Sequence, residues 1–154
     1  MVARRSMAAP VRQPGPERLG RRSLLRAGVV LALVLSIPKT AWAGSYLNRA
    51  ALLLTQAGKD ADYLRVRLGD RELCEVIHKL AVARVDAAGS MEVPKEVVQA
   101  HPHLLLVLEN YERATAAAAD GKTQQFVVYQ LKAREEERTL RGVLKQLGWT
   151  LPSV

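Results

Sequence analysis

Apolar residues after residue 46 recur with the period of a helix that buries one face. Between residues 47 and 68 the apolar positions are separated alternately by three and four residues, as expected for an inward-facing stripe. These positions are Leu47, Ala50, Leu54, Ala57, Ala61, Leu64 and Leu68. We expect this first helix to end at Gly69 in the left-handed conformation, with Asp70 capping the next helix.

Three further segments show the same period. The second helix is predicted to bury Leu73, Ile77, Leu80, Arg84 and Ala87 and to stop at Gly89. The third begins at Pro102 and is predicted to bury Leu104, Val107, Leu108, Tyr111, Thr115 and Ala118. The fourth is predicted to bury Phe126, Tyr129, Ala133, Leu140, Leu144 and Leu147. The sequence therefore predicts an all-α, up-and-down four-helix bundle over residues 44–154.

The connections between these helices carry recognisable stop and start signals. The long connection from residue 89 to 101 has room for a helical turn or two after Pro94. Asp120-Gly121 predicts the turn before the fourth helix, and Thr123 is the expected cap of that helix. Trp149, in the short tail, is expected to fold back onto the end of the bundle.

The first 43 residues have the organisation of an export leader. A basic region, residues 1–26, precedes an apolar segment of eleven residues, 27–37. Eleven residues fall well short of the roughly 20 that a membrane-spanning helix needs. Ala41-Trp42-Ala43 then offers the small side chains of a signal-peptidase site, so we expect cleavage after Ala43. Ahead of the bundle, this predicts a disordered segment followed by a cleavable signal helix.

The leader also resembles a twin-arginine translocation signal, whose pattern is Ser/Thr-Arg-Arg-x-Phe-Leu-Lys. Arg21, Arg22, Leu25 and Arg26 match that pattern, while Gly20 replaces the hydroxyl residue and Leu24 the aromatic one. The resemblance covers residues 20–43 and implies recognition by an export translocon and export of the folded domain. The general secretory route and an uncleaved anchor are the alternatives.

Most of the chain's positive charge lies in the leader. The whole chain carries 23 Lys and Arg against 15 Asp and Glu, a formal net charge of +8. Eight of the basic residues but only one of the acidic residues precede residue 44, so residues 44–154 hold 15 basic and 14 acidic residues. Nucleic-acid binding therefore loses its main support. We expect a soluble periplasmic protein without a stable membrane span once the leader is removed.

Three histidines are the candidate metal ligands. His101 and His103 flank the start of the third helix, and His78 lies in the second. Three imidazoles could hold zinc or copper if the two helix ends approach each other. Glu75 and His78 have the spacing of a di-iron ligand pair, but helical geometry turns both away from the predicted core. The expectation is accordingly no cofactor, with a histidine-bound metal as the alternative.

Two more features have structural interpretations. Cys74, the only cysteine, falls at the edge of the second helix's apolar face, which indicates a partly buried structural thiol. Glu136 and Glu137 flank the apolar face of the fourth helix, and Arg84 lies on that of the second. An ion pair between Arg84 and Glu137 is one expectation.

A second apolar surface is predicted on the third and fourth helices. Several apolar side chains there lie off the predicted core faces, namely Leu105, Leu106, Val127, Val128 and Leu131. Such a surface suits a protein partner or a homodimer, unless the 89–101 connection covers it. No nucleophile signature, phosphate loop or cysteine pair is present. The sequence therefore favours an exported, non-enzymatic protein-interaction or scaffold module, with a metal- or cofactor-binding bundle as the alternative.

Overall fold

Four long helices and one short 3-10 helix make up the part of the chain that the structure, a computed structural model, describes. That part comprises residues 39–154, with side chains from residue 43 onward. The helices are α2 (Lys39–Arg65), α3 (Arg71–Gly89), η1 (Lys95–Ala100), α4 (His101–Ala119) and α5 (Thr123–Gln146). No strand occurs between residues 39 and 154, so the prediction of an all-α domain of four helices is confirmed there. The predicted disordered segment and the apolar part of the leader lie outside these residues.

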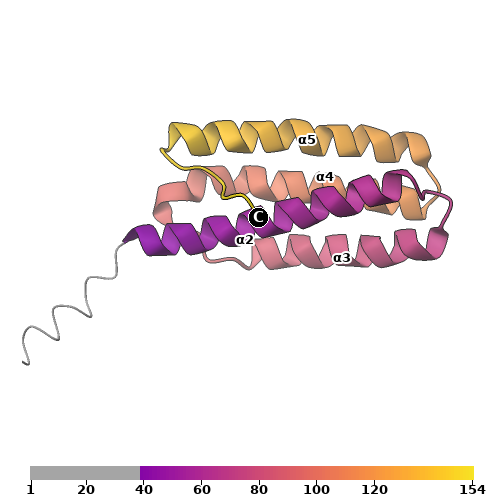
Figure 1. Cartoon of the computed structure of the whole chain (residues 1–154), viewed down its shortest axis with the longest axis horizontal. Helices are drawn as coiled ribbons and strands as arrows, with labels where there is room; N and C mark the ends of the chain where they lie inside the picture. The colour runs from indigo at the N-terminus through magenta and orange to yellow at the C-terminus, as the bar shows by residue number, and fades with distance from the viewer. Residues whose placement is uncertain (1–38) are drawn as a thin grey trace, which may run out of the picture. The chain divides into compact units, whose positions relative to one another are not determined.

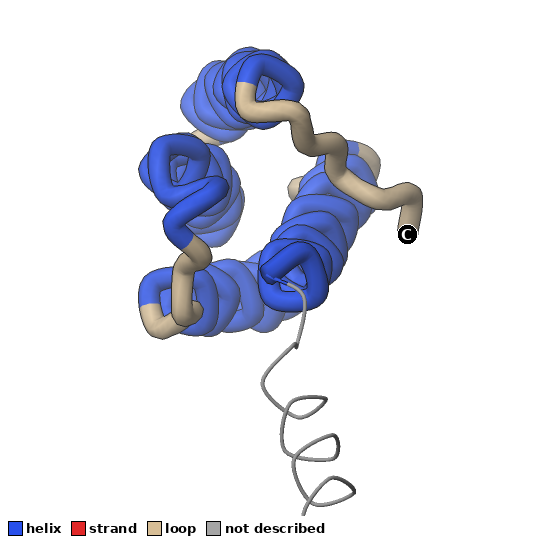
Figure 2. The backbone as a smooth tube through the Cα atoms, turned by 90° about the vertical axis from the view of Figure 1, so that its left-hand side faces the viewer, coloured by secondary structure: helices blue, strands red, loops and turns tan. Residues whose placement is uncertain are grey.

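The four long helices surround a shared core and run alternately in opposite directions (Figure 1). α4 contacts α2, α3, α5 and η1, and it is the only long helix with this many partners in the described range. α2 and α5, in contrast, approach each other closely at very few points. Viewed along the bundle, the segment after α5 crosses from α5 towards α2 (Figure 2).

The apolar stripes predicted for α2 and α4 form the core. All six positions predicted for α4 are buried, and so are six of the seven predicted for the first helix. The seventh, Leu68, is half-buried and lies beyond the end of α2 at Arg65, so the predicted helix is too long at that end. In α5 the predicted positions Phe126, Ala133, Leu140 and Leu144 are buried, while Tyr129 and Leu147 are half-buried. Val97 and Ala100 of η1 are also buried, so the turn after Pro94 forms as predicted and seals one end. Trp149 packs against the main core cluster.

The predicted face of α3 is wrong by a rotation of about one residue. Cys74, Ile77, Ala81 and Ala88 are buried, whereas Leu80 is 48% exposed and Ala87 is exposed. Three of the four buried side chains are small, and Cys74 and Ile77 share one core cluster with Ala114 and Ala117 of α4. A helix face of small side chains lets two helix backbones approach closely. The predicted face, with Leu73 and Leu80, is bulkier and would keep the two backbones further apart. Packing against α4, and not the spacing of the large apolar residues of α3, therefore decides which face of α3 is buried.

Helix ends explain where the chain turns. Asp70 caps α3 as predicted, because its carboxylate accepts a hydrogen bond from the Leu73 backbone N–H at 3.0 Å. Thr123 does not cap α5: it is the first residue of that helix, and the side chain of Lys122 at the capping position bonds Asp120 and not the backbone of the helix. Gly69 does not adopt the left-handed conformation either, since successive three-residue backbone hydrogen bonds from Arg67 and Asp70 close that turn.

Two other glycines do adopt positive φ, at the C-terminal ends of α4 and α5. Gly121 has φ of 74° and Gly148 has φ of 82°. At each end the residue after the glycine donates to the carbonyl five positions earlier, Lys122 to Ala117 and Trp149 to Leu144, both at 2.8 Å. This is the Schellman arrangement, which satisfies terminal carbonyls and requires a residue that tolerates positive φ. It also directs Trp149 back onto the bundle.

Replacing Asp70 by alanine is expected to lower the free energy of unfolding by about 1 kcal/mol, because the N-terminal amide of Leu73 loses its acceptor. Urea unfolding followed by circular dichroism measures the change. Lys122→Ala is the matched control, since it alters a capping position whose side chain bonds no backbone amide. Equal losses in the two variants would contradict the capping role.

Candidate functional site

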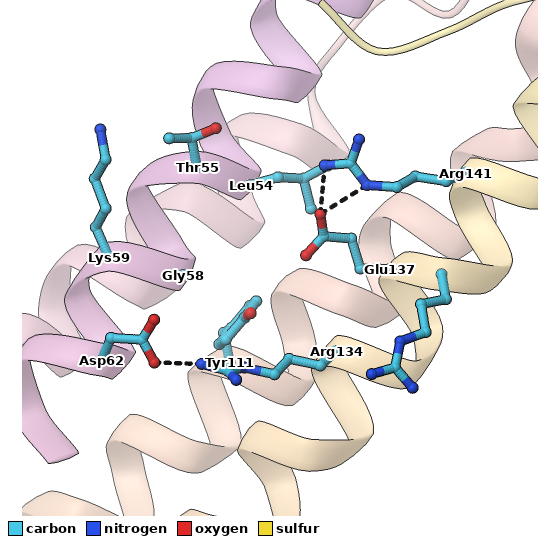
Figure 3. Close-up of a pocket in the computed structure, with 10 residues that line it drawn as sticks. Leu54, Thr55, Gly58, Lys59, Asp62, Tyr111, Arg134, Glu137 and Arg141 are labelled. Carbon is cyan, nitrogen blue, oxygen red and sulfur yellow. Dashed lines mark hydrogen bonds and ion pairs between the residues drawn. The ribbon is translucent and has the colours of Figure 1, made fainter. Parts of the chain in front are cut away.

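A cleft of about 450 Å³ lies between α2 and α5. The α2 wall consists of Leu54, Thr55, Gly58, Lys59 and Asp62. The α5 wall consists of Arg134, Glu137, Arg138 and Arg141, and Tyr111 of α4 lies at the bottom (Figure 3). The cleft is open because α2 and α5 pack on α4 and hardly on each other. Its volume is in the usual range for small-molecule sites.

The spacing of residues along each helix places these side chains on the cleft. Arg134, Arg138 and Arg141 follow one another at four and three residues, so they share one face of α5. On α2, Leu54, Gly58 and Asp62 recur every four residues and share one face in the same way. Gly58 leaves space beside Tyr111: a Cβ atom there would lie 3.6 Å from the phenolic oxygen.

Two carboxylates in the cleft are already paired. Asp62 accepts a hydrogen bond from Arg134 (Figure 3) and a second, at 2.9 Å, from the buried amide of Gln130. Glu137 accepts from Nε of Arg141 at 3.0 Å and from Nη2 of the same residue at 2.6 Å. The first pair links α2 to α5, whereas the second lies within α5. Neither carboxylate needs a metal or ligand to satisfy it.

Two cations in the cleft have no such partner. Lys59 on α2 and Arg138 on α5 form no ion pair with any side chain of the described region. Four basic and two acidic side chains line the cleft, so the lining carries a net positive charge. A cleft of this kind attracts anions, and guanidinium groups bind carboxylate and phosphate oxygens especially well.

Tyr111 supplies a neutral hydroxyl at the bottom of the cleft. Burial is the main cause that raises the pKa of this phenol, with the charge of Glu137 adding to the effect and Arg134 opposing it. The side chain is therefore protonated at physiological pH and retains its O–H donor. Tyr111 extends the set of hydrogen-bond donors that the arginines and Lys59 present.

The three histidines make three separate sets of contacts. His101 Nδ1 lies 3.0 Å from the hydroxyl of Tyr46, and His103 bonds Glu136 of α5. His78 lies 3.3 Å from the hydroxyl of Thr115, so the prediction that His78 points away from the bundle is wrong. Glu75 is exposed, as predicted. Among the described residues, no three His, Cys, Asp or Glu side chains are grouped to hold a metal ion, so the structure does not assemble the suggested histidine site.

The predicted pair of Arg84 and Glu137 does not form. Arg84 instead pairs with Asp60 of the neighbouring helix α2, while Glu137 pairs with Arg141. Because α3 is rotated relative to the prediction, Arg84 reaches α2 and not α5. Cys74 is fully buried, deeper than predicted, and burial with the nearby charge of Asp70 raises its thiol pKa. A buried thiol held in its neutral form is a poor nucleophile.

The predicted second apolar surface is exposed in part. Leu106 of α4 is 39% exposed, and Val128 and Leu131 of α5 are 45% and 56% exposed. Leu105 and Val127 are half-buried, and Leu105 packs against the main core. η1 contacts both α4 and α5, yet these three side chains stay accessible. We refer to Leu106, Val128 and Leu131 as the apolar row.

Of the predicted leader, the structure describes only residues 39–43. Arg21, Arg22, Leu25 and Arg26 lie outside the described residues. α2 begins at Lys39, so the backbone of Ala41 and Ala43 is helical, and Ala43 is buried. Proteases act on exposed, locally unfolded segments. Cleavage after Ala43 therefore requires the first turn of α2 to open. No helix of the described part is long and apolar enough to cross a bilayer.

Sequence reasoning missed the cleft residues for a definable reason. Glu137 and Arg84 were considered, but the row of three arginines on α5 looks from the sequence like an ordinary solvated face. The spacing of 134, 138 and 141 was the available signal. This spacing became meaningful only with α2 opposite, and Asp62 on α2 is 72 residues away from Arg134 in the sequence. Comparisons of the chain with protein-family models, curated proteins and solved structures gave no match, so the function must be argued from the site.

The burial of Tyr46 should appear in the alkaline stability of the protein. Burial raises the pKa of Tyr46 to about 12 from 10.0, so the folded state keeps a proton that the unfolded state releases between those values. The stabilisation is complete below pH 10 and is lost as the pH rises towards 12. We expect Tyr46→Phe to make the free energy of unfolding less dependent on pH in this window.

Urea unfolding at pH 9, 10 and 11 measures this dependence. Tyr63→Phe is the control, because that side chain is 47% exposed. An unchanged slope in the Tyr46 variant would contradict the assignment.

Proposed function

We propose that this chain is an exported, non-catalytic binding protein whose cleft between α2 and α5 takes an anionic ligand. The observation that carries the proposal is the lining of the cleft, in which four basic side chains outnumber two acidic ones and the phenol of Tyr111 lies at the bottom. Guanidinium groups that line a concave site are a usual means by which proteins bind an anion.

Binding accounts for the cleft better than catalysis does. A hydrolytic or transfer reaction needs a nucleophile or a base whose pKa lies near the working pH. The two carboxylates of the cleft are engaged by arginines, and Tyr111 has its pKa raised. The thiol of Cys74 is fully buried. The remaining groups can hold a ligand without reacting with it.

Export follows from the leader. The match of residues 20–26 to a twin-arginine signal supports recognition by the translocon for folded proteins, and Ala41 and Ala43 support later cleavage. A bundle that buries its core around α4 can be folded before export. A periplasmic location would place the cleft among the small anions of that compartment.

A second candidate function is binding of a protein partner or a second copy through the apolar row. Its support is the exposure of Leu106, Val128 and Leu131 on adjacent helices that pack against each other. Three exposed apolar residues bury little area by themselves, so an interface would have to extend beyond them. The cleft remains the better-supported site.

The cleft proposal predicts saturable binding of inorganic phosphate to residues 44–154 at a fixed ionic strength of about 0.15 M. Arg138→Ala should weaken that binding about tenfold, since a charge-assisted hydrogen bond is lost. Isothermal titration calorimetry measures the affinity. Arg113→Ala on α4 is the matched control: Arg113 is an exposed arginine outside the cleft, paired with Glu109. Equal weakening in both variants would show non-specific screening.

The apolar row predicts a concentration-dependent oligomer that Val128→Glu converts to the monomer, because a buried charge without a partner is costly. Sedimentation velocity over a range of protein concentrations detects this change. Val66→Glu, at a position 80% exposed beyond the end of α2, is the control. A wild-type chain that is monomeric at every concentration would remove self-association as the role of the row.

A further inference from the structure

We infer that Ala43 has two mutually exclusive roles, as the residue before the cleavage site of the leader and as a core residue of the bundle. Folding of α2 then blocks removal of the leader, and the contact between Tyr46 and His101 controls how fast the folded chain is cleaved. This inference rests on the export part of the proposed function and not on the cleft.

Ala43 extends the buried stripe of α2 by one step towards the start of the helix. It precedes Leu47 by four residues, and Leu47 precedes Ala50 by three, which is the spacing of the rest of the stripe. The side chain of Ala43 is 0% exposed, and those of Leu47 and Ala50 are 4% and 2% exposed. The folded bundle therefore holds the methyl group of Ala43 in its interior.

A signal peptidase requires the same side chain in its own pocket. The small residues that it recognises are the first and third before the cleaved bond, here Ala43 and Ala41. α2 begins at Lys39, so the backbone on both sides of the cleaved bond is helical. Proteases act on segments that are exposed and locally unfolded. The methyl group of Ala43 cannot occupy the core and the peptidase pocket at the same time.

The turn of α2 that follows the cleaved bond is anchored to α4. Tyr46 is 2% exposed, and its hydroxyl lies 3.0 Å from Nδ1 of His101, the first residue of α4. The centroids of the two rings are 5.9 Å apart. Tyr46 and Leu47 also belong to the main core cluster. Because a peptidase holds residues on both sides of the bond that it cuts, cleavage requires Tyr46 to leave His101.

Cleavage of the folded chain then proceeds through opening of the first turns of α2. When opening and closing are fast compared with cleavage, the rate is that of the unfolded segment multiplied by the fraction of molecules that are open. Removing a contact that holds these turns raises that fraction. The loss of one hydrogen bond is expected to raise it about two- to tenfold.

The order of folding and cleavage thus decides whether the leader is removed. A chain that crosses unfolded by the general secretory route presents Ala43 before the bundle has packed. A chain that is exported folded, as the match of residues 20–26 to a twin-arginine signal implies, presents Ala43 in the core. On the folded route, opening of α2 limits the removal of the leader.

The experiment measures cleavage of the whole chain by a purified signal peptidase in detergent, with the product identified by mass spectrometry. The unfolded reference carries Val107→Asp and Leu108→Asp, because two charges buried in the core without partners prevent packing. Loss of the cooperative thermal transition verifies that this reference is unfolded, and residues 1–50 are unchanged in it. We expect the reference to be cut after Ala43 at least about a hundredfold faster than the wild type.

A substitution far from the cleaved bond in the sequence tests the contact of Tyr46. His101→Phe removes the hydrogen-bonding nitrogen, keeps an aromatic ring and leaves the sequence around the bond unchanged. We expect it to raise the cleavage rate of the folded chain about two- to tenfold. His78→Phe is the matched control, since His78 also lies against a hydroxyl, that of Thr115 near the other end of α4. It should leave the rate unchanged, and thermal midpoints separate global destabilisation from local opening.

The outcomes are distinguishable. Equal cleavage rates for the wild type and the unfolded reference would overturn the inference and leave the leader and its export role intact. Failure of the unfolded reference to be cut after Ala43 would overturn the leader assignment, and with it the export part of the proposed function. Equal effects of His101→Phe and His78→Phe would overturn control of cleavage by the contact with Tyr46.

Discussion

Close packing around α4 is the constraint on which the rest of the structure depends. α4 carries alanines at three of its inward positions, Ala114, Ala117 and Ala118, and all are buried. Small side chains allow neighbouring helices to approach closely, and α2, α3 and α5 each pack against this helix. Each fully buried large side chain, such as Phe126 or Leu108, contributes about 1.5–3 kcal/mol. Exposed ion pairs such as that of Arg134 with Asp62 contribute about 1 kcal/mol or less. The core therefore determines where the helices lie, and the polar pairs adjust their surfaces.

The cleft is a consequence of this arrangement. With α2 and α5 both supported by α4, their facing surfaces do not have to meet, and the gap is lined by arginine, lysine and carboxylate side chains. Asp62 closes one part of the gap by bonding Gln130 and Arg134. Where no acidic partner stands opposite, at Lys59 and Arg138, positive charge remains. The polar lining is thus a result of the packing of α2, α3 and α5 against α4. It supplies the groups proposed to bind the ligand.

The sequence predicted some of these elements well and others poorly, for physical reasons. The stripes of α2 and α4 were predicted correctly because their buried leucines and alanines recur together at regular helical spacing. The face of α3 was predicted wrongly because its small residues, Cys74, Ala81 and Ala88, pack inward while Leu80 stays exposed. A prediction from the spacing of apolar residues places the largest apolar side chains in the core. Two helices that pack closely bury small side chains instead. The same rotation explains why Arg84 pairs with Asp60 and not with Glu137.

By itself, the sequence determined the features that depend on neighbouring residues: the presence of four helices, the cap at Asp70 and the glycine turn at Gly121. Local hydrogen bonds and side-chain periodicity fix such features without reference to the rest of the fold. Only the tertiary structure decided which residues meet across the bundle. It separated the three histidines, gave Asp62 its partners on α5, and brought the arginines of α5 to one cleft with α2. These outcomes depend on how each helix rotates against α4, and that rotation is set by the shapes of side chains far apart in the chain.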